Sequence, residues 1–295
     1  MSKDVEDSLA YGGQALIEGV MMRSGDKMVM CVRQPNQEIA TFCQKFNGLT
    51  KSRWYLRIPI IRGVAVLFET LYFGVKAMMQ SANVALEEED EEFTFFDYLI
   101  LVLMLVGVNG LFIAIPFFLT NFLHLKGLLF NIVESLIRLG LFMAYLYGIS
   151  LWGEVARVLQ YHGAEHKAIN AYEAGSNMEI EDVVRYSRLN PRCGTSFLFL
   201  TVFTSIALFA LIPRTTFLLR LAYRLALIPF IAGVSYELLK LSDRFRDSPI
   251  MKIIITPGLW FQKLTTKEPS DDMVEVAVKA LNELTKSIDH QIKIE

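Results

Sequence analysis

Two of the chain's four histidines lie four residues apart, in the stretch YHGAEHKAINAYE at 161–173. Residues at positions i and i+4 of an α-helix project from one face about 6 Å apart, so His162 and His166 could bind one metal ion. Glu165 completes the pattern H-x-x-E-H, the inverted zincin motif, in which the carboxylate is the general base toward a water that the metal activates. The spacing therefore predicts a site for a divalent metal, with zinc as the candidate ion.

A catalytic zinc site usually takes three protein ligands and leaves one position for water. Two carboxylates are candidates for the third ligand: Glu173, on the same helical face, and Glu237, near the end of a downstream apolar segment. Glu237 is favoured because inverzincin-type sites take their third carboxylate from a separate element. The opposing interpretation is structural, because paired histidines near a membrane can simply form hydrogen bonds and a five-residue pattern recurs by chance.

Polar side chains in two other stretches could add to a site. Those near the N-terminus follow a pair of glycines and are Gln14, Glu18 and Arg23. An ordinary turn with one ion pair explains them equally well. Those at the opening of the third apolar run are Asn190, Arg192 and Cys193. Exposed amides there could bind an anion, but helix capping is the favoured interpretation, and no base adjoins Cys193 in the sequence to activate it as a nucleophile.

The composition indicates a membrane protein. Of 295 residues, 53% are hydrophobic and only 20% are charged, and the mean hydropathy is +0.36, which is too apolar for an ordinary soluble domain. The net charge of −2 gives no excess of basic residues that would bind nucleic acid.

The three cysteines are widely spaced, so neither a disulfide framework nor a zinc ribbon is expected. The acidic start lacks the features of a signal peptide, so we expect a cytoplasmic N-terminus.

Four apolar segments predict transmembrane helices, at about 98–120, 128–152, 193–213 and 217–238. The first is free of charge and long enough to cross a hydrocarbon core of ~30 Å at ~1.5 Å per residue. The second carries Glu134 and Arg138 at i and i+4, where they can neutralise each other. The fourth carries Arg220 and Arg224, which we expect to snorkel to the interface, with contact to Glu134 inside the bundle as the alternative.

Loop charge orients these segments, since the loop before the third segment and the tail after the fourth carry most of the lysines and arginines. The positive-inside rule then places both termini and the central loop in the cytoplasm.

The fold predicted is an all-α membrane protein with about four transmembrane helices, an amphipathic or re-entrant helix, a small N-terminal β-hairpin region and a C-terminal cytoplasmic helix. The predicted segments are 1–57, N-terminal cytoplasmic and mixed α/β; 58–96, amphipathic helix and acidic cap; 97–153, transmembrane hairpin one; 154–192, cytoplasmic loop with the HxxEH motif; 193–239, transmembrane hairpin two; and 240–295, C-terminal cytoplasmic segment and helix.

Local patterns predict the remaining elements. Residues 27–34 and 38–46 suit two strands of a hairpin. Within 58–85, Arg62, Glu69 and Lys76 recur every seven residues, which predicts a helix with one wet face, although a fifth span is an alternative. The acidic run at 87–92 is expected to be a solvated cap. Apolar spacing within 271–293 predicts a capped amphipathic helix.

Four motifs occur in order along the chain: GGQALIEGVMMRS, YHGAEHKAINAYE, PRCGTSF and PGLWFQKLTTKEP. Together they resemble the YqhQ-like family of bacterial multi-pass membrane proteins over nearly the whole chain. The resemblance implies the plasma membrane of a bacterium and a metal-dependent enzyme, with His162 and His166 as the motif histidines and Glu165 between them. Similar proteins often have a histidine where this chain has Asn190, which leaves the third ligand open.

Two hypotheses of function follow. The first is a membrane-embedded, cytoplasm-facing metal-dependent hydrolase that acts on a membrane peptide, a lipid or an amphipathic small molecule. The second is a non-catalytic scaffold or transporter, in which Glu134, Arg138, Arg220 and Arg224 form a buried charge network. In both, the lipid bilayer is the expected partner and nucleic acid is not.

Overall fold

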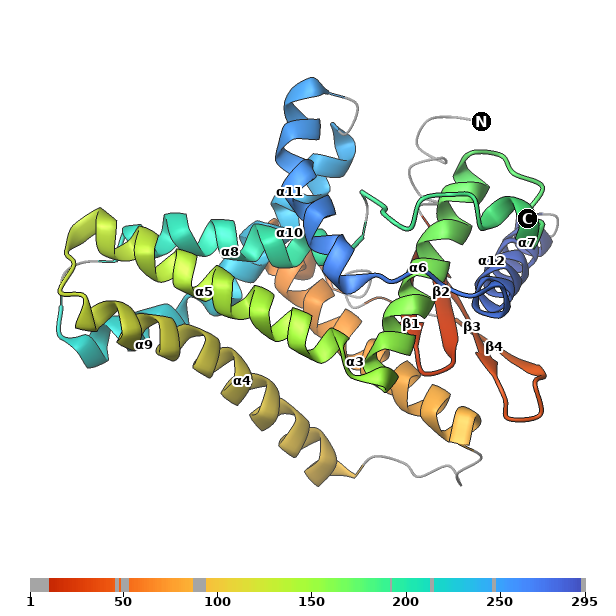
Figure 1. Cartoon of the computed structure of the whole chain (residues 1–295), viewed down its shortest axis with the longest axis horizontal. Coiled ribbons are helices and arrows are strands. Elements are labelled where there is room, and N and C mark those ends of the chain that lie inside the picture. Colours follow the sequence, from red (N-terminus) through yellow and green to blue (C-terminus); the bar gives the residue numbers. More distant parts are fainter. Residues whose placement is uncertain are drawn as a thin grey trace.

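The computed structural model of the chain describes residues 11–45, 48, 53–86, 94–191, 193–212, 215–245 and 248–292. Figure 1 shows an elongated group of helices at one end and a β-sheet flanked by helices at the other. We call the first group the helical arm; it comprises α4 (Phe95–Phe122), α5 (Gly127–Ser150), α8 (Thr195–Ala210), α9 (Phe217–Ala226) and α10 (Ile228–Arg244). The described chain therefore combines helices with a sheet, and the prediction of an all-α fold is wrong.

The sheet has four antiparallel strands in the order β1-β2-β3-β4. They are β1 (Gly12–Leu16), β2 (Gly19–Ser24), β3 (Lys27–Arg33) and β4 (Ile39–Lys45). The predicted hairpin is confirmed as β3 and β4, which pair from Lys27 with Lys45 to Arg33 with Ile39. The first two strands were not predicted, because their glycines resemble a turn. Gly25, at a positive φ of 60°, makes the tight turn that joins β2 to β3.

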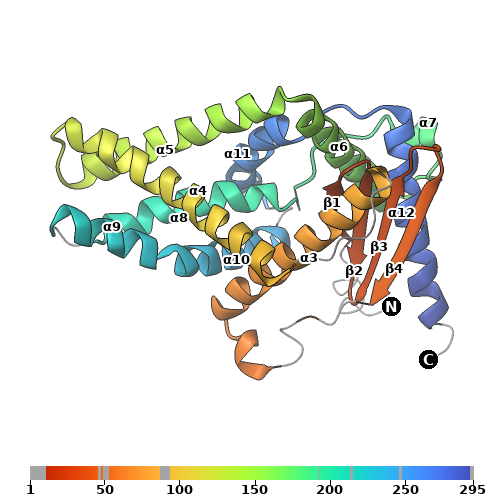
Figure 2. The ribbon, with the colours of Figure 1, turned by 90° about the horizontal axis from the view of Figure 1, so that it is seen from below.

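Both faces of the two central strands, β2 and β3, are buried. Val20, Met22 and Val29 belong to the core on one face, which includes helices α6 (Gly153–Glu173) and α12 (Asp271–Ile292). Met21 and Met30 point the other way and belong to a second core with helix α3 (Ile61–Leu86). Figure 2 shows α3 and α12 on opposite sides of the sheet. Double coverage explains why β2 and β3 are almost continuously apolar instead of alternating with polar residues.

The predicted C-terminal helix is confirmed as α12, whose apolar stripe is fully buried. It packs against α6, β2 and β3. The short helix α7 (Ile180–Val183) closes the same core. Segments that we predicted as separate cytoplasmic pieces, at the N-terminus, in the central loop and at the C-terminus, thus form one packed unit.

Helix α3 follows a 3₁₀ turn, η2 (Trp54–Arg57), and differs from its predicted amphipathic pattern. Glu69 is only 4% exposed, whereas Phe68 and Tyr72 are exposed. The prediction of a wet face through Arg62, Glu69 and Lys76 is therefore wrong at Glu69. The reason is tertiary, since α3 packs against α10 as well as against the sheet, and Glu69 acts electrostatically on Arg23 of β2. The acidic run at 87–92 lies outside the described residues.

The prediction of about four transmembrane helices is also wrong. Among the described residues, α5 is the one helix long and apolar enough to cross a membrane. A second would be counted only if α9 and α10, which are bent by 41° at their junction, formed one broken span. Two further apolar helical stretches that were found are shorter: Gly110–Phe122, within α4, and Thr195–Ala210. At ~1.5 Å per residue, the sixteen residues of α8 reach about 24 Å, less than the ~30 Å hydrocarbon core.

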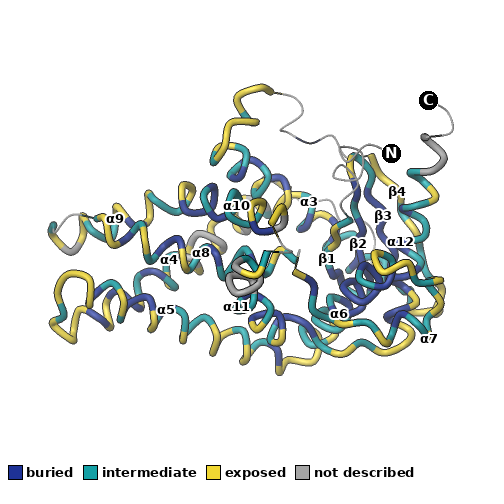
Figure 3. The backbone as a smooth tube through the Cα atoms, turned by 90° about the horizontal axis from the view of Figure 1, so that it is seen from above, coloured by how far each residue is buried: buried dark blue, intermediate teal, exposed yellow. Residues whose placement is uncertain are grey.

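Burial differs between the two ends of the molecule. In Figure 3 the buried positions gather around the sheet, α6 and α12, while exposed positions recur along α4 and α5. Many exposed residues of the arm are large and apolar; they include Leu103, Leu111, Phe118, Leu128, Leu129, Leu136, Phe203 and Leu218. The sheet end therefore has the core of an ordinary globular domain, whereas the arm exposes apolar surface.

Candidate metal centre

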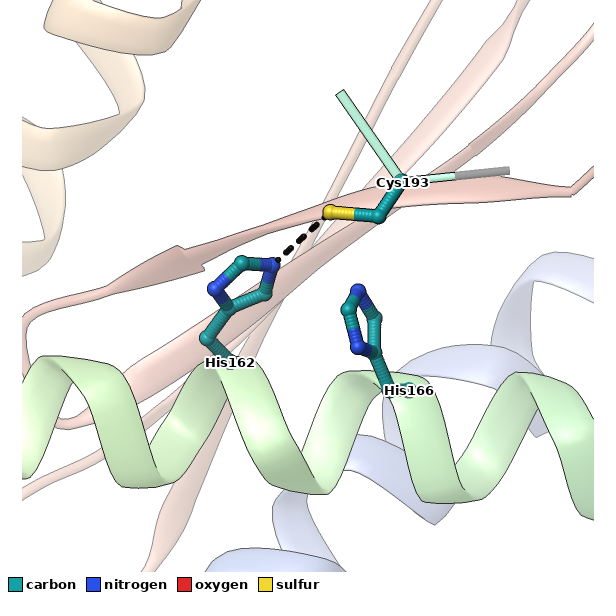
Figure 4. A group of neighbouring side chains, drawn as sticks. All are labelled: His162, His166 and Cys193. Atoms are coloured by element: carbon teal, nitrogen blue, oxygen red, sulfur yellow. Dashed lines mark hydrogen bonds between the residues drawn. The ribbon is translucent and has the colours of Figure 1, made fainter. Parts of the chain in front are cut away.

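The H-x-x-E-H residues lie on α6, the most enclosed helix of the sheet end. From Gly163 to Ile169 every residue of α6 is buried. The rings of His162 and His166 face each other with centroids 4.4 Å apart and planes at 62°, and both project from the same side of the helix (Figure 4). The predicted i and i+4 geometry is therefore confirmed. Three consecutive buried polar residues, Glu165, His166 and Lys167, are unusual inside a helix and need partners.

Backbone carbonyls fix the orientation of both imidazoles. Nδ1 of His162 lies 2.7 Å from the carbonyl oxygen of Thr265, and Nδ1 of His166 lies 2.6 Å from that of Arg188. A carbonyl oxygen only accepts, so each Nδ1 carries the proton. In the neutral tautomer each Nε2 then has a free lone pair, as in metal-binding histidines whose other nitrogen is held by a carbonyl.

Cys193 supplies the third donor atom. Its Sγ lies 3.2 Å from Nε2 of His162 (Figure 4), and the donor atoms of His162, His166 and Cys193 all lie within 4.8 Å of one another. Zinc bonds of about 2.0–2.3 Å in a tetrahedron require neighbouring ligand atoms about 3.5 Å apart. One pair already meets this distance, and the wider pairs need to close by about 1 Å. The group therefore fits a His₂Cys site with a fourth position open.

His166 carries an unsatisfied atom. Its side chain is 1% exposed, and its Nε2 is buried without a hydrogen-bond partner among the described residues. Glu165 lies too far for a hydrogen bond, since its Oε2 is 3.8 Å from this nitrogen. The lone pair of this buried nitrogen has no hydrogen-bond partner and lies next to a second imidazole and a thiol, an arrangement suited to binding a metal ion.

Glu165 lies between the two histidines, with Oε2 3.8 Å from Nε2 of each. Burial raises the pKa of Glu165 from 4.5 to about 7, although the nearby His162 opposes the rise. Gly13 of β1 makes the space for this carboxyl group, because a Cβ there would come within 2.7 Å of Oε1. The carboxyl group can therefore exchange a proton near neutral pH.

The loop that carries Cys193 is anchored to α6 by its polar residues. Nζ of Lys167 donates to the carbonyl of Val184 at 2.6 Å, and Nδ2 of Asn170 donates to that of Ser187 at 2.7 Å. Further along, Asn190 and Gln262 of helix α11 (Pro249–Thr265) bond reciprocally at 2.9 and 2.7 Å. These bonds position the loop that presents Cys193.

The segment after α11 is held against the other side of the site. The amide of Lys267 donates to the carbonyl of Leu159 at 2.8 Å. Gly163 permits this approach, because a Cβ there would collide with the carbonyl oxygen of Lys267. The close contact places the Thr265 carbonyl against His162.

The carboxylates predicted as third ligand lie elsewhere. Glu237 of α10 forms an ion pair with Arg62 of α3, and Arg62 holds the pKa of that carboxyl group below its ordinary value. Glu173 is exposed at the end of α6. The described donor group contains neither residue and has Cys193 as its third member.

The other predicted residues have mainly structural contacts. Gln14 donates to the carbonyl of Gly74 at 3.3 Å, and Glu18 accepts two hydrogen bonds from Arg157 at 2.6 and 2.5 Å. Arg23 is half-buried, and burial lowers its pKa. Asn190 belongs to the loop described above, and Arg192 lies outside the described residues. The glycine-rich N-terminal motif thus contributes space, at Gly13, instead of a ligand.

The charged residues of the arm form the network that the second hypothesis required. Glu134 pairs with Arg138 and with Arg224, which is completely buried. The expectation that Arg224 snorkels is therefore wrong, and the interior alternative is correct. Arg220 is half-buried and lies 5.3 Å above the ring of Phe130.

Two comparisons with known proteins place the chain among uncharacterised relatives. Residues 58–287 match a family described as "Protein of unknown function (DUF1385)". The chain is 36% identical over 298 residues to "Uncharacterized protein YqhQ" of Bacillus subtilis (strain 168), covering 94% of this chain and 92% of that protein. No solved structure matches the chain.

Proposed function

The chain belongs to the DUF1385 family of proteins of unknown function, and from its own site we propose that it is a metal-dependent hydrolase. His162, His166 and Cys193 are the metal ligands in this proposal, and Glu165 is the general base. Zinc is the candidate ion, because two imidazoles and one sulfur suit its preference for nitrogen and sulfur in a tetrahedron.

The observation that carries the proposal is the buried, unpartnered Nε2 of His166. Leaving a buried acceptor unsatisfied costs about 1–3 kcal/mol. That cost is repaid by an ion bound between this nitrogen, Nε2 of His162 and Sγ of Cys193, which lie within 4.8 Å of one another. The carbonyls of Thr265 and Arg188 hold both rings in the tautomer that binding requires.

Each residue has a distinct part in hydrolysis. A bound divalent ion supplies Lewis-acid activation of water and of a substrate oxygen. Glu165 accepts the proton of the attacking water at Oε2 and returns it to the leaving group, a role that its position between the two histidines allows. The side chain of His162 is 15% exposed, so the substrate side of the site lies at His162 and Cys193 instead of at the enclosed His166.

A second candidate activity rests on the distance of 3.2 Å between Sγ of Cys193 and Nε2 of His162. This is the geometry of a cysteine nucleophile and its histidine base, with the Thr265 carbonyl orienting the ring. Such a dyad needs no metal and leaves His166 without a role. The orphaned atom of His166 is the reason for ranking the dyad second.

Lipid is the partner that we propose for the helical arm. Its exposed leucines and phenylalanines form more apolar surface than a water-exposed domain of this size usually carries. Helix α5 is long and apolar enough to cross a membrane, and α6, which carries the site, begins three residues after α5 ends. A hydrolase centre next to a membrane boundary suits a membrane peptide or a lipid as substrate.

Elemental analysis of the purified full-length protein tests the metal proposal. About one zinc per chain is expected in the wild type, and His166→Ala should lose it together with His162→Ala and Cys193→Ser. Glu173→Gln and Glu237→Gln are matched controls that remove the carboxylates first considered and should keep the metal.

Cobalt substitution separates the two candidate activities. A cobalt-loaded wild type should show a sulfur-to-metal charge-transfer band that Cys193→Ser abolishes. If the wild type is metal-free and His166→Ala retains thiol reactivity toward an acylating reagent while His162→Ala loses it, the cysteine dyad replaces the metal centre.

A further inference from the structure

A cavity of about 580 Å³ lies at the end of the helical arm remote from the sheet. It is an open pocket lined by the start of α5, the end of α8 and part of α9, which meet at one end of the molecule in Figures 1 and 2. Its polar lining residues are Lys126, Asn131 and Arg220. The metal centre does not use this cavity, because it lies on α6 beside the sheet.

The charges on the cavity wall have one sign. Lys126 and Arg220 are both lining residues, and none of the described lining residues is acidic. Arg220 also lies 5.3 Å above the ring of Phe130, another lining residue. Contact with the ring holds the guanidinium at the cavity wall.

Behind the wall lies a second excess of positive charge. Glu134 is the single carboxylate paired with two guanidiniums, those of Arg138 and Arg224. Arg224 is 0% exposed, and its Nε has no hydrogen-bond acceptor among the described residues. An uncompensated buried cation is costly, and the aromatic rings of Phe117 and Phe209, 4.7 and 4.8 Å away, offset only part of that cost.

Asn131 connects the buried charges to the cavity. Its Oδ1 accepts a hydrogen bond from NH2 of Arg224 at 3.3 Å, and the residue itself lines the cavity. Because the oxygen is taken by Arg224, the amide nitrogen remains the group that Asn131 can offer a ligand. The wall therefore presents two cationic side chains and an amide donor in front of a net positive interior.

We propose that this cavity binds a phosphate group, either free or as the headgroup of an anionic lipid. A guanidinium fork matches two phosphate oxygens, and an ammonium adds a point charge. The volume exceeds what a simple ion needs, and the apolar residues Leu128, Phe130 and Phe209 on the same wall suit the glycerol and acyl carbons next to a lipid phosphate. Binding places negative charge against the excess of the Arg138, Arg224 and Glu134 cluster.

Binding measurements on the full-length protein in detergent test the proposal with three probes. They are inorganic phosphate, phosphatidylglycerol and diacylglycerol, which has the same acyl chains and no phosphate. Saturable binding of phosphatidylglycerol but not of diacylglycerol identifies a lipid headgroup, and binding of inorganic phosphate identifies the free anion. Arg220→Gln should weaken either interaction about tenfold or more, since it removes a charge-assisted pair.

Two variants complete the test. Lys126→Gln removes the exposed cation at the rim and should also weaken binding, so the result does not depend on how well Arg220→Gln folds. Lys286→Gln removes an exposed lysine on α12 and should change nothing. Failure of both phosphate-bearing probes to bind, or affinity unchanged in Arg220→Gln and Lys126→Gln, overturns the proposal. Either result leaves the zinc content of the α6 site unaffected.

Discussion

Replacing Gly163 with alanine should destabilise the protein, although alanine normally stabilises a helix relative to glycine. A methyl group at this position meets the carbonyl oxygen of Lys267 and lies 3.3 Å from Cδ of Pro269. Alanine gains about 1 kcal/mol in helix propensity. Overpacking costs about 1–3 kcal/mol, and moving Lys267 loses its 2.8 Å bond to Leu159, worth about 1 kcal/mol. The expected net loss in the free energy of unfolding is about 1–3 kcal/mol.

The same substitution should weaken metal binding without touching a ligand. Displacing Lys267 moves the carbonyl of Thr265, which lies 2.7 Å from Nδ1 of His162. Loss of a group that orients a metal-binding histidine typically costs about 10–100-fold in affinity. Chemical denaturation gives the stability, and titration with a competing chelator gives the metal affinity.

Gly153→Ala is the matched control on the same helix. Nothing lies within 4 Å of a Cβ at this position, so stability and metal affinity should equal or slightly exceed those of the wild type. If Gly163→Ala is as stable as Gly153→Ala and binds metal as tightly, the close approach of Lys267 to α6 is refuted, together with the role given to the Thr265 carbonyl.

Two further predictions concern buried charge. Glu134→Gln should cost about 3–5 kcal/mol in unfolding free energy, because it leaves Arg138 and Arg224 without their shared carboxylate. The control Glu283→Gln breaks the exposed pair with Lys286 and should cost under about 1 kcal/mol. Equal losses of stability in the two variants would contradict the burial argument. In metal-free protein, the pKa of Glu165 is raised to about 7 from 4.5, so folding favours its protonated form. The contribution of this one group to the free energy of unfolding is greatest below about pH 4.5 and should fall by about 3 kcal/mol as pH rises to about 7. The difference between wild type and Glu165→Gln, measured by denaturation across this range, should show that fall, and a difference independent of pH would contradict it.

The sequence predicted the part of the site that depends on local spacing. His162, Glu165 and His166 share a helix, so the period of that helix alone brings them together. Cys193 comes from a loop whose position depends on Lys167, on Asn170 and on other long-range hydrogen bonds that leave no pattern in the sequence. The carbonyls of Thr265 and Arg188 are backbone groups, which carry no residue signal at all. The sequence therefore pointed to a carboxylate as the third ligand, whereas the proposed centre uses Cys193.

The fold divides in the same way. The β3–β4 hairpin and helix α12 follow from alternation and from apolar spacing, and both were predicted. The transmembrane segments were counted from charge-free runs, which do not reveal where helices end; α8 ends after sixteen residues, and α9 is separated from α10 by a bend of 41°. Strands β1 and β2 escaped prediction because Gly13 and Gly19, which resemble turn residues, are needed for close packing.

X-ray absorption spectroscopy at the zinc edge tests the central claim most directly. The site described predicts one sulfur at about 2.3 Å and two imidazole nitrogens at about 2.0–2.1 Å, with a lighter atom completing the shell. Purified Cys193→Ser and His166→Ala should lose the bound zinc; any zinc that they take up when it is supplied in excess should lack the sulfur in Cys193→Ser and one imidazole in His166→Ala. A metal shell without sulfur, or a wild-type protein that binds no zinc when it is supplied, would contradict the assignment of His162, His166 and Cys193 as a metal centre.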